Sequence, residues 1–200
     1  MLFWGALWGF AEATVGFILH RAAIALPGLP GLLMFPIAFF FMHRAVLSSK
    51  SPDSAFLASL VAASIKLADF LLPGYDALRI VNPALSMLAE GLAVYVVMGY
   101  CDSRKVSIGA LAAFGMGLLW RGAFSLYLLA ISLYGLPAAL VTGGWAYALR
   151  FLLLESAVNA LIILAYLRSS EKAPMFLKAD PSAWAAIAAL LLAIAANLAI

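Results

Sequence analysis

Seven ionisable side chains lie inside stretches that are otherwise apolar enough to cross a lipid bilayer. They are Glu12, Lys66, Asp69, Glu90, Arg121, Arg150 and Glu155. A charge near the bilayer centre costs roughly 2.5–3.5 kcal/mol on insertion scales, so membrane helices rarely carry one without a function. Such residues either form ion pairs or line a pathway for a ligand or an ion.

The composition places the chain among integral membrane proteins. The 200 residues are 66% hydrophobic and 10% charged, and the mean hydropathy is +1.09, which is far outside the range of soluble domains. We expect a single all-α domain (residues 1–200), a polytopic helical bundle in the membrane. The lone Cys101 excludes a disulfide within the chain and a metal site built from several cysteines. The first segment carries Glu12 and lacks a basic n-region, which indicates a retained helix.

Seven apolar stretches are each near the roughly 20 residues that cross the hydrocarbon. We place them at Leu2–Leu19, Gly31–Ser48, Ser54–Leu72, Ala84–Tyr100, Val106–Tyr134, Gly144–Leu167 and Ser182–Ile200. Pro36 interrupts the second stretch, and Pro83 is positioned for the first turn of the fourth. We expect a core of six helices in residues 1–170 and an additional C-terminal helix in residues 181–200.

The basic residues between these stretches indicate the orientation. One side of the membrane receives Arg44, Lys50, Arg104, Lys105, Arg168, Lys172 and Lys178, and the other receives Arg21 and Arg79. Seven basic residues on one side against two on the other make a positive-inside bias. We therefore expect a multi-pass protein of the cell membrane with a cytoplasmic N-terminus. The net charge of +3 is explained by this bias, and we expect the lipid bilayer, not nucleic acid, as the partner. The last stretch either crosses the membrane or lies along its surface.

The depth of the charged residues predicts where a polar site lies. At about 1.5 Å per residue, Lys66 is about 18 Å and Arg121 about 23 Å from the cytoplasmic ends of their stretches. Glu90 and Arg150 lie about 10 Å below the outer surface by the same rise. The charges are therefore expected in the outer half of the membrane, as in a pocket reached from outside.

Helical spacing sorts the polar residues further. Lys66 and Asp69 are three residues apart and can form an ion pair on one helix face. Glu155 and Asn159 are four apart and make a polar stripe. Arg150 and Glu155 are five apart and project to different sides of a regular helix, so we expect Arg150 to pair with another helix or a ligand.

We expect a binding site for a small-molecule ligand. Its candidate residues are Glu12, Glu90, Trp120, Arg121, Arg150, Glu155 and Asn159. An alternative is that these groups form buried ion pairs in a structural or assembly subunit of a larger membrane complex. A second alternative is an intramembrane enzyme in which Glu12, Glu90 and Glu155 do acid–base work. HExxH, GxSxG and phosphate-binding glycine motifs are absent from the sequence, so we expect no catalytic residues, metal or cofactor.

Gly5, Gly9 and Ala13 recur at four-residue intervals in the first stretch. Small residues at this spacing let a second helix approach closely, as in GxxxG contacts. We therefore expect this stripe to contact the helix of a partner protein.

With this stripe and the outer-half polar cluster, residues 1–170 resemble the substrate-binding S components of energy-coupling-factor transporters. Those proteins have six helices and a substrate pocket that opens to the outside. The resemblance implies uptake of a vitamin or another micronutrient, together with a membrane coupling subunit that contacts the first helix and is driven by ATPases. The chain departs from the family pattern by glycine at positions where alanine is favoured and by the seventh apolar stretch.

Overall fold

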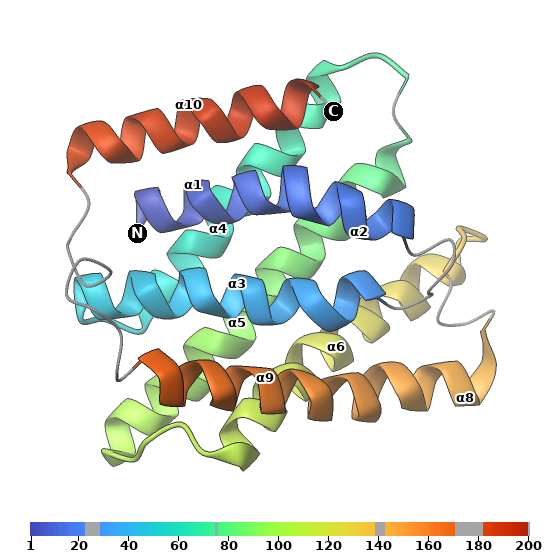
Figure 1. The fold of residues 1–200 in the computed structure, drawn as a ribbon. Coiled ribbons are helices and arrows are strands. Elements are labelled where there is room, and N and C mark those ends of the chain that lie inside the picture. Colours follow the sequence, from blue (N-terminus) through green and yellow to red (C-terminus); the bar gives the residue numbers. More distant parts are fainter. Residues whose placement is uncertain (23–28, 75, 139–142, 171–181, 200) are drawn as a thin grey trace.

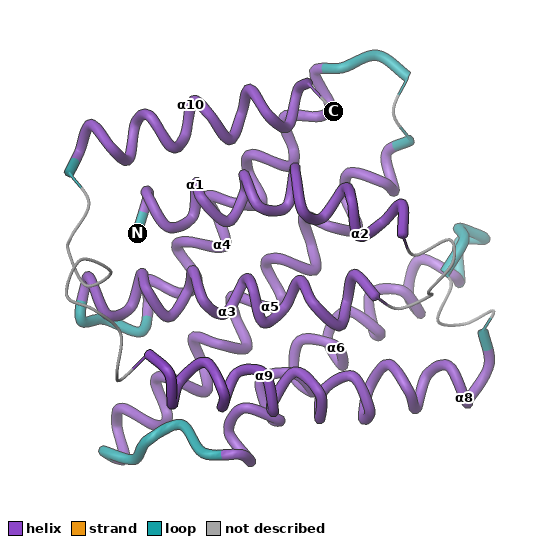
Figure 2. Tube along the Cα trace, in the orientation of Figure 1, coloured by secondary structure: helices purple, strands orange, loops and turns teal. Residues whose placement is uncertain are grey.

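The computed structural model covers residues 1–200 and describes all of them except 23–28, 75, 139–142, 171–181 and 200. The described part consists of helices and short connections, without a strand (Figure 2). This confirms the all-α fold class that the composition predicts.

The helices begin and end close to the predicted stretches. In chain order they are α1 (Leu2–Ala11), the π-helical segment η1 (Glu12–Gly16), α2 (Phe17–Ala22), α3 (Leu29–Ser49), α4 (Asp53–Leu67), the 3-10 segment η2 (Ala68–Leu71), α5 (Ala77–Arg104), α6 (Ala110–Ser132), α8 (Gly144–Leu149), the π-helical segment η3 (Arg150–Leu154), α9 (Glu155–Ser170) and α10 (Ala183–Ala199). Short segments join end to end into longer helices, and six of the resulting helices are long and apolar enough to cross a membrane. The chain is thus a multi-pass membrane protein.

The helices form two layers (Figure 1). In one layer α10, α1, α3 and the α8–α9 helix lie side by side. In the other, α4, α5 and α6 lie side by side and cross the first layer obliquely. The core between the layers includes Phe35 and Phe39 from α3, Met87 from α5, and Met116 and Trp120 from α6.

The helix whose start differs most from the prediction is α5. We expected it to begin at Ala84, next to Pro83 in the first turn, but it begins at Ala77. The Asp76 side chain caps it by accepting a hydrogen bond from the Leu78 backbone N–H at 3.0 Å. Pro83 lies inside the helix, which membrane helices tolerate where neighbouring groups compensate for the missing N–H. Residues along α5 therefore lie deeper in the bundle than the sequence suggested.

The C-terminal helix α10 belongs to the bundle. It lies beside α1 and runs in the same direction, so that the two chain ends lie at opposite ends of the molecule (Figure 1). Ala189 and Ala193 pack with Ala6 of α1 and Ile65 of α4. Its 17 residues span about 26 Å at the α-helical rise. It is apolar but shorter than the six helices that are long enough to cross a membrane, and a seventh crossing stays a prediction.

The small-residue stripe of α1 faces α4 of the same chain. A Cβ atom added to Gly5 would lie 2.7 Å from the Ala58 carbonyl oxygen, and one added to Gly9 would lie 2.6 Å from Cδ1 of Ile65. Ala13, the third member of the stripe, is buried. The close helix approach that the spacing predicts is present, but at Gly5 and Gly9 the partner helix is internal, which corrects the expectation of a contact with another protein.

Candidate functional site

Most of the candidate residues form two separate groups. Arg121 of α6 lies with Trp120, Arg150, Glu155 and Asn159 between α6, α9 and the start of α3, and we call these five residues the Arg121 cluster. The second group is built around Lys66 and Asp69 at the end of α4.

Arg121 is completely enclosed, with 0% of its surface exposed. Its Nη2 atom donates to the Gly31 carbonyl at 2.9 Å and to Oδ1 of Asn159 at 2.7 Å. Its Nη1 atom makes longer hydrogen bonds, 3.5 Å to the Gly117 carbonyl and 3.4 Å to Oγ of Ser156. One guanidinium group therefore joins α3, α6 and α9.

Pro36 explains why Asn159 is part of this arrangement. In an α-helix the N–H of residue 36 would donate to the carbonyl of Leu32, but proline has no N–H. Nδ2 of Asn159 donates to that Leu32 carbonyl at 2.6 Å, while its Oδ1 accepts from Arg121. Asn159 thus satisfies the acceptor that Pro36 leaves open and positions the guanidinium at the same time.

The π-helical segment η3 brings Arg150 and Glu155 together. Nε of Arg150 lies 3.7 Å from Oε1 of Glu155. In a regular α-helix residues five apart diverge, but a π-helix closes its hydrogen bonds between residues i and i+5 and so aligns them. The expectation that Arg150 turns away from Glu155 is therefore wrong, because the sequence does not reveal the π-helical turn. Arg150 is half exposed, with 47% of its side-chain surface accessible.

Glu155 also approaches Arg121, without a hydrogen bond. Its Oε2 atom lies 3.7 Å from Nη2 of Arg121, beyond hydrogen-bond distance. An Nη atom carries two N–H groups, and those of Nη2 are directed to Gly31 and Asn159. The contact is therefore an ion pair without a shared proton.

Two aromatic rings enclose the guanidinium. Cζ of Arg121 lies 4.5 Å from the ring centroid of Trp120 and 5.3 Å from that of Phe151. The two rings meet edge to face, with centroids 5.8 Å apart. Cation–π contacts of this kind stabilise a desolvated cation by about 2 kcal/mol, which helps to offset the burial of Arg121.

Three fully buried polar atoms of this cluster have no hydrogen-bond partner among the described residues. They are Nε1 of Trp120, Nε of Arg121 and Oε2 of Glu155. Leaving a buried donor or acceptor unsatisfied costs about 1–3 kcal/mol, and more for a charged group. The Arg121 cluster thus contains two N–H donors and one carboxylate acceptor that lack a hydrogen-bond partner among the described residues.

Glu90 and Glu12 lie outside this hydrogen-bonded group. Glu90 is buried on α5, and the charged groups that act on it are Glu12 and Arg121. Glu12 is the first residue of η1, so both π-helical segments of the described chain adjoin a candidate carboxylate. The two carboxylates extend the polar interior from the Arg121 cluster towards α1.

Arg121 and Glu90 lie near the middle of their helices, deeper than the sequence predicted. Arg121 is eleven residues from either end of α6, and Glu90 is thirteen residues from the start of α5 and fourteen from its end. The expected outer position followed from placing the starts of these helices at Val106 and Ala84. The observed helix starts at Ala110 and Ala77 shift both residues to mid-depth.

Lys66 and Asp69 form an ion pair, with Nζ 2.6 Å from Oδ2. Nδ2 of Asn197 on α10 donates to Oδ1 of Asp69 and to the Ile65 carbonyl. This group connects the C-terminal helix to α4, and both carboxylate oxygens of Asp69 have partners. The Arg121 cluster, by contrast, contains buried atoms without a hydrogen-bond partner.

Sequence reasoning missed the partners that come from backbone and small side chains. Two of these partners are the backbone carbonyls of Gly31 and Leu32, and a third is the hydroxyl of Ser156. The one readable signal was Pro36, since a proline inside a helix leaves the carbonyl four residues earlier without its donor.

Two cavities of the described part lie away from the cluster. One of 330 Å³ lies between α1, α4 and α10, and one of 660 Å³ lies between the end of α5 and the start of α6. Their linings include none of the Arg121 cluster residues. Within the described ranges, His, Cys, Asp and Glu residues form no group of three that could hold a metal ion.

Comparison with protein-family models, curated proteins and solved structures found no match to this chain.

Proposed function

We propose that this protein binds a small polar solute at the Arg121 cluster and takes part in moving it across the membrane. The observation that carries the proposal is the set of three buried, unpartnered atoms around one guanidinium group. A solute that fills these positions would replace three unsatisfied groups by hydrogen bonds, two of them charge-assisted.

The open atoms define the chemistry of the solute. Trp120 and Arg121 offer N–H donors, so the solute needs an acceptor such as a carbonyl or carboxylate oxygen. Glu155 offers an acceptor, so the solute needs an N–H or O–H donor. The rings of Trp120 and Phe151 favour a flat apolar portion. A neutral or zwitterionic heterocycle with an amide or acid group fits this description.

The described conformation encloses Arg121, so it corresponds to a closed state in this proposal. The π-helical segments η1 and η3 adjoin the polar interior, and segments of this kind are frequent at functional sites. We propose them as the places where α1 and the α8–α9 helix adjust when the solute enters. A role like that of a transporter S component, with a separate energy-coupling module, is part of this proposal.

The proposal predicts that replacing Trp120 by phenylalanine weakens solute binding. Trp120→Phe keeps a ring against Arg121 and removes only the Nε1–H donor, so affinity should fall about tenfold for one lost hydrogen bond. The measurement is native mass spectrometry of the purified protein, first to identify co-purified small molecules and then to titrate the identified one. Trp145→Phe is the matched control, because Trp145 is exposed at the start of α8.

A solute bound equally well by wild type and Trp120→Phe contradicts the assignment of this site. A wild-type protein that never carries a small molecule contradicts the binding function itself.

A structural role is the alternative that specific contacts favour. Arg121 already joins three helices through Gly31, Asn159 and Ser156, as expected of an assembly or scaffold subunit. In that case Trp120→Phe should leave every ligand measurement unchanged, and Arg121→Gln should only lower stability, by about 3–5 kcal/mol for a broken buried pair.

A further inference from the structure

A second buried cation lies on α3, and unlike Arg121 it has no hydrogen-bond acceptor among the described residues. Arg44 is more than nine-tenths buried, with 8% of its surface exposed. No residue in the described part of the chain forms an ion pair with it or accepts a hydrogen bond from it. The ring of Trp4 packs against it, with its centroid 5.0 Å from Cζ of Arg44.

The cation–π contact does not satisfy the guanidinium group. An arginine carries five N–H donors, and a buried charge without hydrogen bonds is costly. The fully enclosed unpartnered atoms of the described residues are all in the Arg121 cluster. The nitrogens of Arg44 therefore still reach the surface, where an external acceptor can contact them.

Ser48 places a second open donor next to Arg44. The two residues are four apart on α3, on one helix face about one turn from each other. Oγ of Ser48 accepts a hydrogen bond from Nε1 of Trp4 at 3.1 Å, and its own O–H has no acceptor among the described residues. Trp4 thus holds both side chains in place while their donors remain available.

The position of this site along the helix indicates the kind of anion. Arg44 is five residues before the end of α3 at Ser49, and Trp4 is two residues after the start of α1. Both lie near helix ends, at the level where tryptophan and lipid headgroups meet. Leu47 is an exposed apolar side chain three residues from Arg44 on α3, and it offers a surface to acyl chains.

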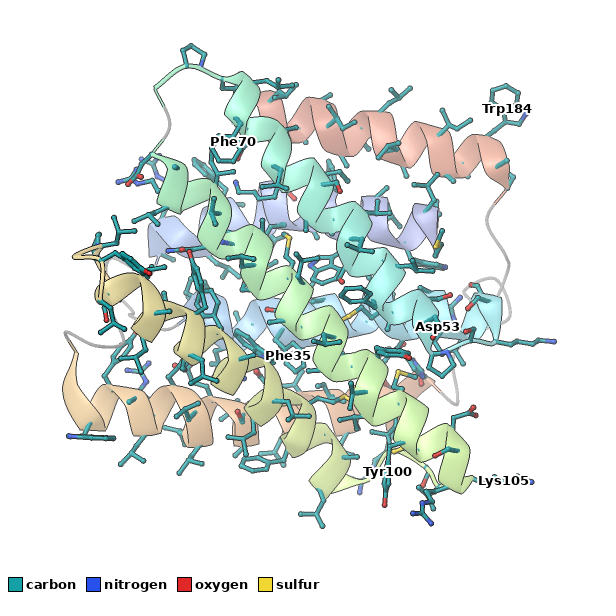
Figure 3. The ribbon with its side chains drawn as sticks, turned by 180° about the vertical axis from the view of Figure 1, so that it is seen from behind. Phe35, Asp53, Phe70, Tyr100, Lys105 and Trp184 are labelled. Atoms are coloured by element: carbon teal, nitrogen blue, oxygen red, sulfur yellow. The ribbon has the colours of Figure 1, made fainter. Side chains whose placement is uncertain are left out.

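The surrounding charge favours an anion. The same end of the bundle carries Lys50, Arg104, Lys105 and Arg168 against Asp53 and Asp102; the two basic and two acidic residues of the segment 171–181 lie outside the described residues. Figure 3 shows Asp53, Tyr100 and Lys105 at this end and Phe70 towards the other. A basic end attracts anionic lipids by about 1 kcal/mol for each lysine or arginine near the surface.

We propose that Arg44, Ser48 and Trp4 bind the phosphate group of an anionic phospholipid at this end of the bundle. The guanidinium and the Ser48 hydroxyl donate to the phosphate oxygens, and Trp4 fixes the angle of the guanidinium. This site is independent of the solute site, because it shares no residue with the Arg121 cluster.

Native mass spectrometry of the full-length protein, titrated with short-chain phosphatidylglycerol, phosphatidylcholine or inorganic phosphate, tests the proposal. Wild type should bind one phosphatidylglycerol about tenfold more tightly than phosphatidylcholine, because both lipids carry the phosphate but the choline cation cancels its charge and is repelled by Arg44, an effect of about 1 kcal/mol for each basic residue near the headgroup. Arg44→Gln should abolish this preference, and Ser48→Ala should reduce it.

Arg104→Gln is the matched control, because Arg104 also lies over an aromatic ring, 5.7 Å from the Tyr100 centroid, but is exposed at the same end. It should keep the preference. Arg44→Lys retains the charge and serves if Arg44→Gln does not fold; it should weaken the preference without abolishing it.

Three results would overturn the proposal. The first is equal binding of the two lipids by wild type. The second is an equal loss of preference in Arg104→Gln and in the Arg44 variants. The third is displacement of phosphatidylglycerol by inorganic phosphate at equal concentration, which would assign the site to a free anion.

Discussion

Arg121 shows how a single buried residue organises the interior of this bundle. Its strong hydrogen bonds go to a backbone carbonyl and an amide, Gly31 and Asn159, while its carboxylate neighbour Glu155 remains at 3.7 Å. The cation is therefore held chiefly by neutral acceptors. Glu155 keeps an open oxygen, which distinguishes this cluster from a closed ion pair such as that of Lys66 and Asp69.

At the residue scale we predict an energetic coupling between Asn159 and Pro36. Asn159→Ala should cost about 2–4 kcal/mol, because it removes partners from both the Leu32 carbonyl and Arg121. In the Pro36→Ala background the helix supplies its own donor to Leu32, so the same change should cost about 1 kcal/mol less. A double-mutant cycle of unfolding free energies in detergent measures this coupling. Additive effects of the two substitutions would show that Asn159 does not serve the acceptor left open by Pro36.

At the scale of elements, helix contacts depend on where small residues face another backbone. Gly117 on α6 lies against Ser156 on α9: an added Cβ would be 3.0 Å from Cβ and 3.1 Å from Cα of Ser156. Gly115 on the same helix has no atom within 4 Å of such a Cβ. The sequence around the two glycines does not distinguish them, but the packing does.

These two glycines give a matched test of the α6–α9 contact. Gly117→Ala should lower stability by about 1–3 kcal/mol through overpacking, and it should loosen the neighbouring Arg121 cluster. Gly115→Ala should be neutral or stabilising by about 0.5–1 kcal/mol, since alanine favours the helix. Thermal unfolding of both variants in the same detergent is the measurement. The reverse order of stabilities would contradict the observed α6–α9 interface.

The π-helical segment η3 explains why the predicted direction of the Arg150 side chain is wrong. A regular helix of 3.6 residues per turn would separate Arg150 from Glu155. Hydrogen bonds in η3 follow the wider i to i+5 pattern, and the two side chains meet. A local insertion of this kind leaves the length and hydropathy of a helix almost unchanged, so neither reveals it.

At the scale of the whole molecule, α10 turns a six-helix arrangement into one whose two ends lie apart (Figure 1). Its Asn197 binds Asp69 and the Ile65 carbonyl of α4, and its alanines pack on α1. The basic residues predict which end of the bundle faces the cytoplasm, because seven of them lie in the loops of one side or near the helix ends that lead to these loops.

The topology predicts that tags at the two termini report from opposite sides of the membrane. A reporter fused before Met1 should be active only in a cytoplasmic assay, and one fused after Ile200 only in an external assay, because we predict seven crossings and a cytoplasmic N-terminus. Fusions after residue 170 provide the control and should report from the cytoplasm. Cytoplasmic signals from both termini would instead place α10 on the surface.

The sequence by itself determined the fold class, the approximate helix bounds and the Lys66–Asp69 ion pair. Hydropathy, turn residues and i to i+3 spacing act within one segment, so a single segment is enough to read them. Only the tertiary structure decided that α4 covers Gly5 and Gly9, that Arg150 meets Glu155, and that Arg121 binds Gly31 and Asn159. Those contacts depend on how helices distant in the chain are rotated and shifted against one another. Packing of the whole bundle sets these relations, and no local pattern encodes them.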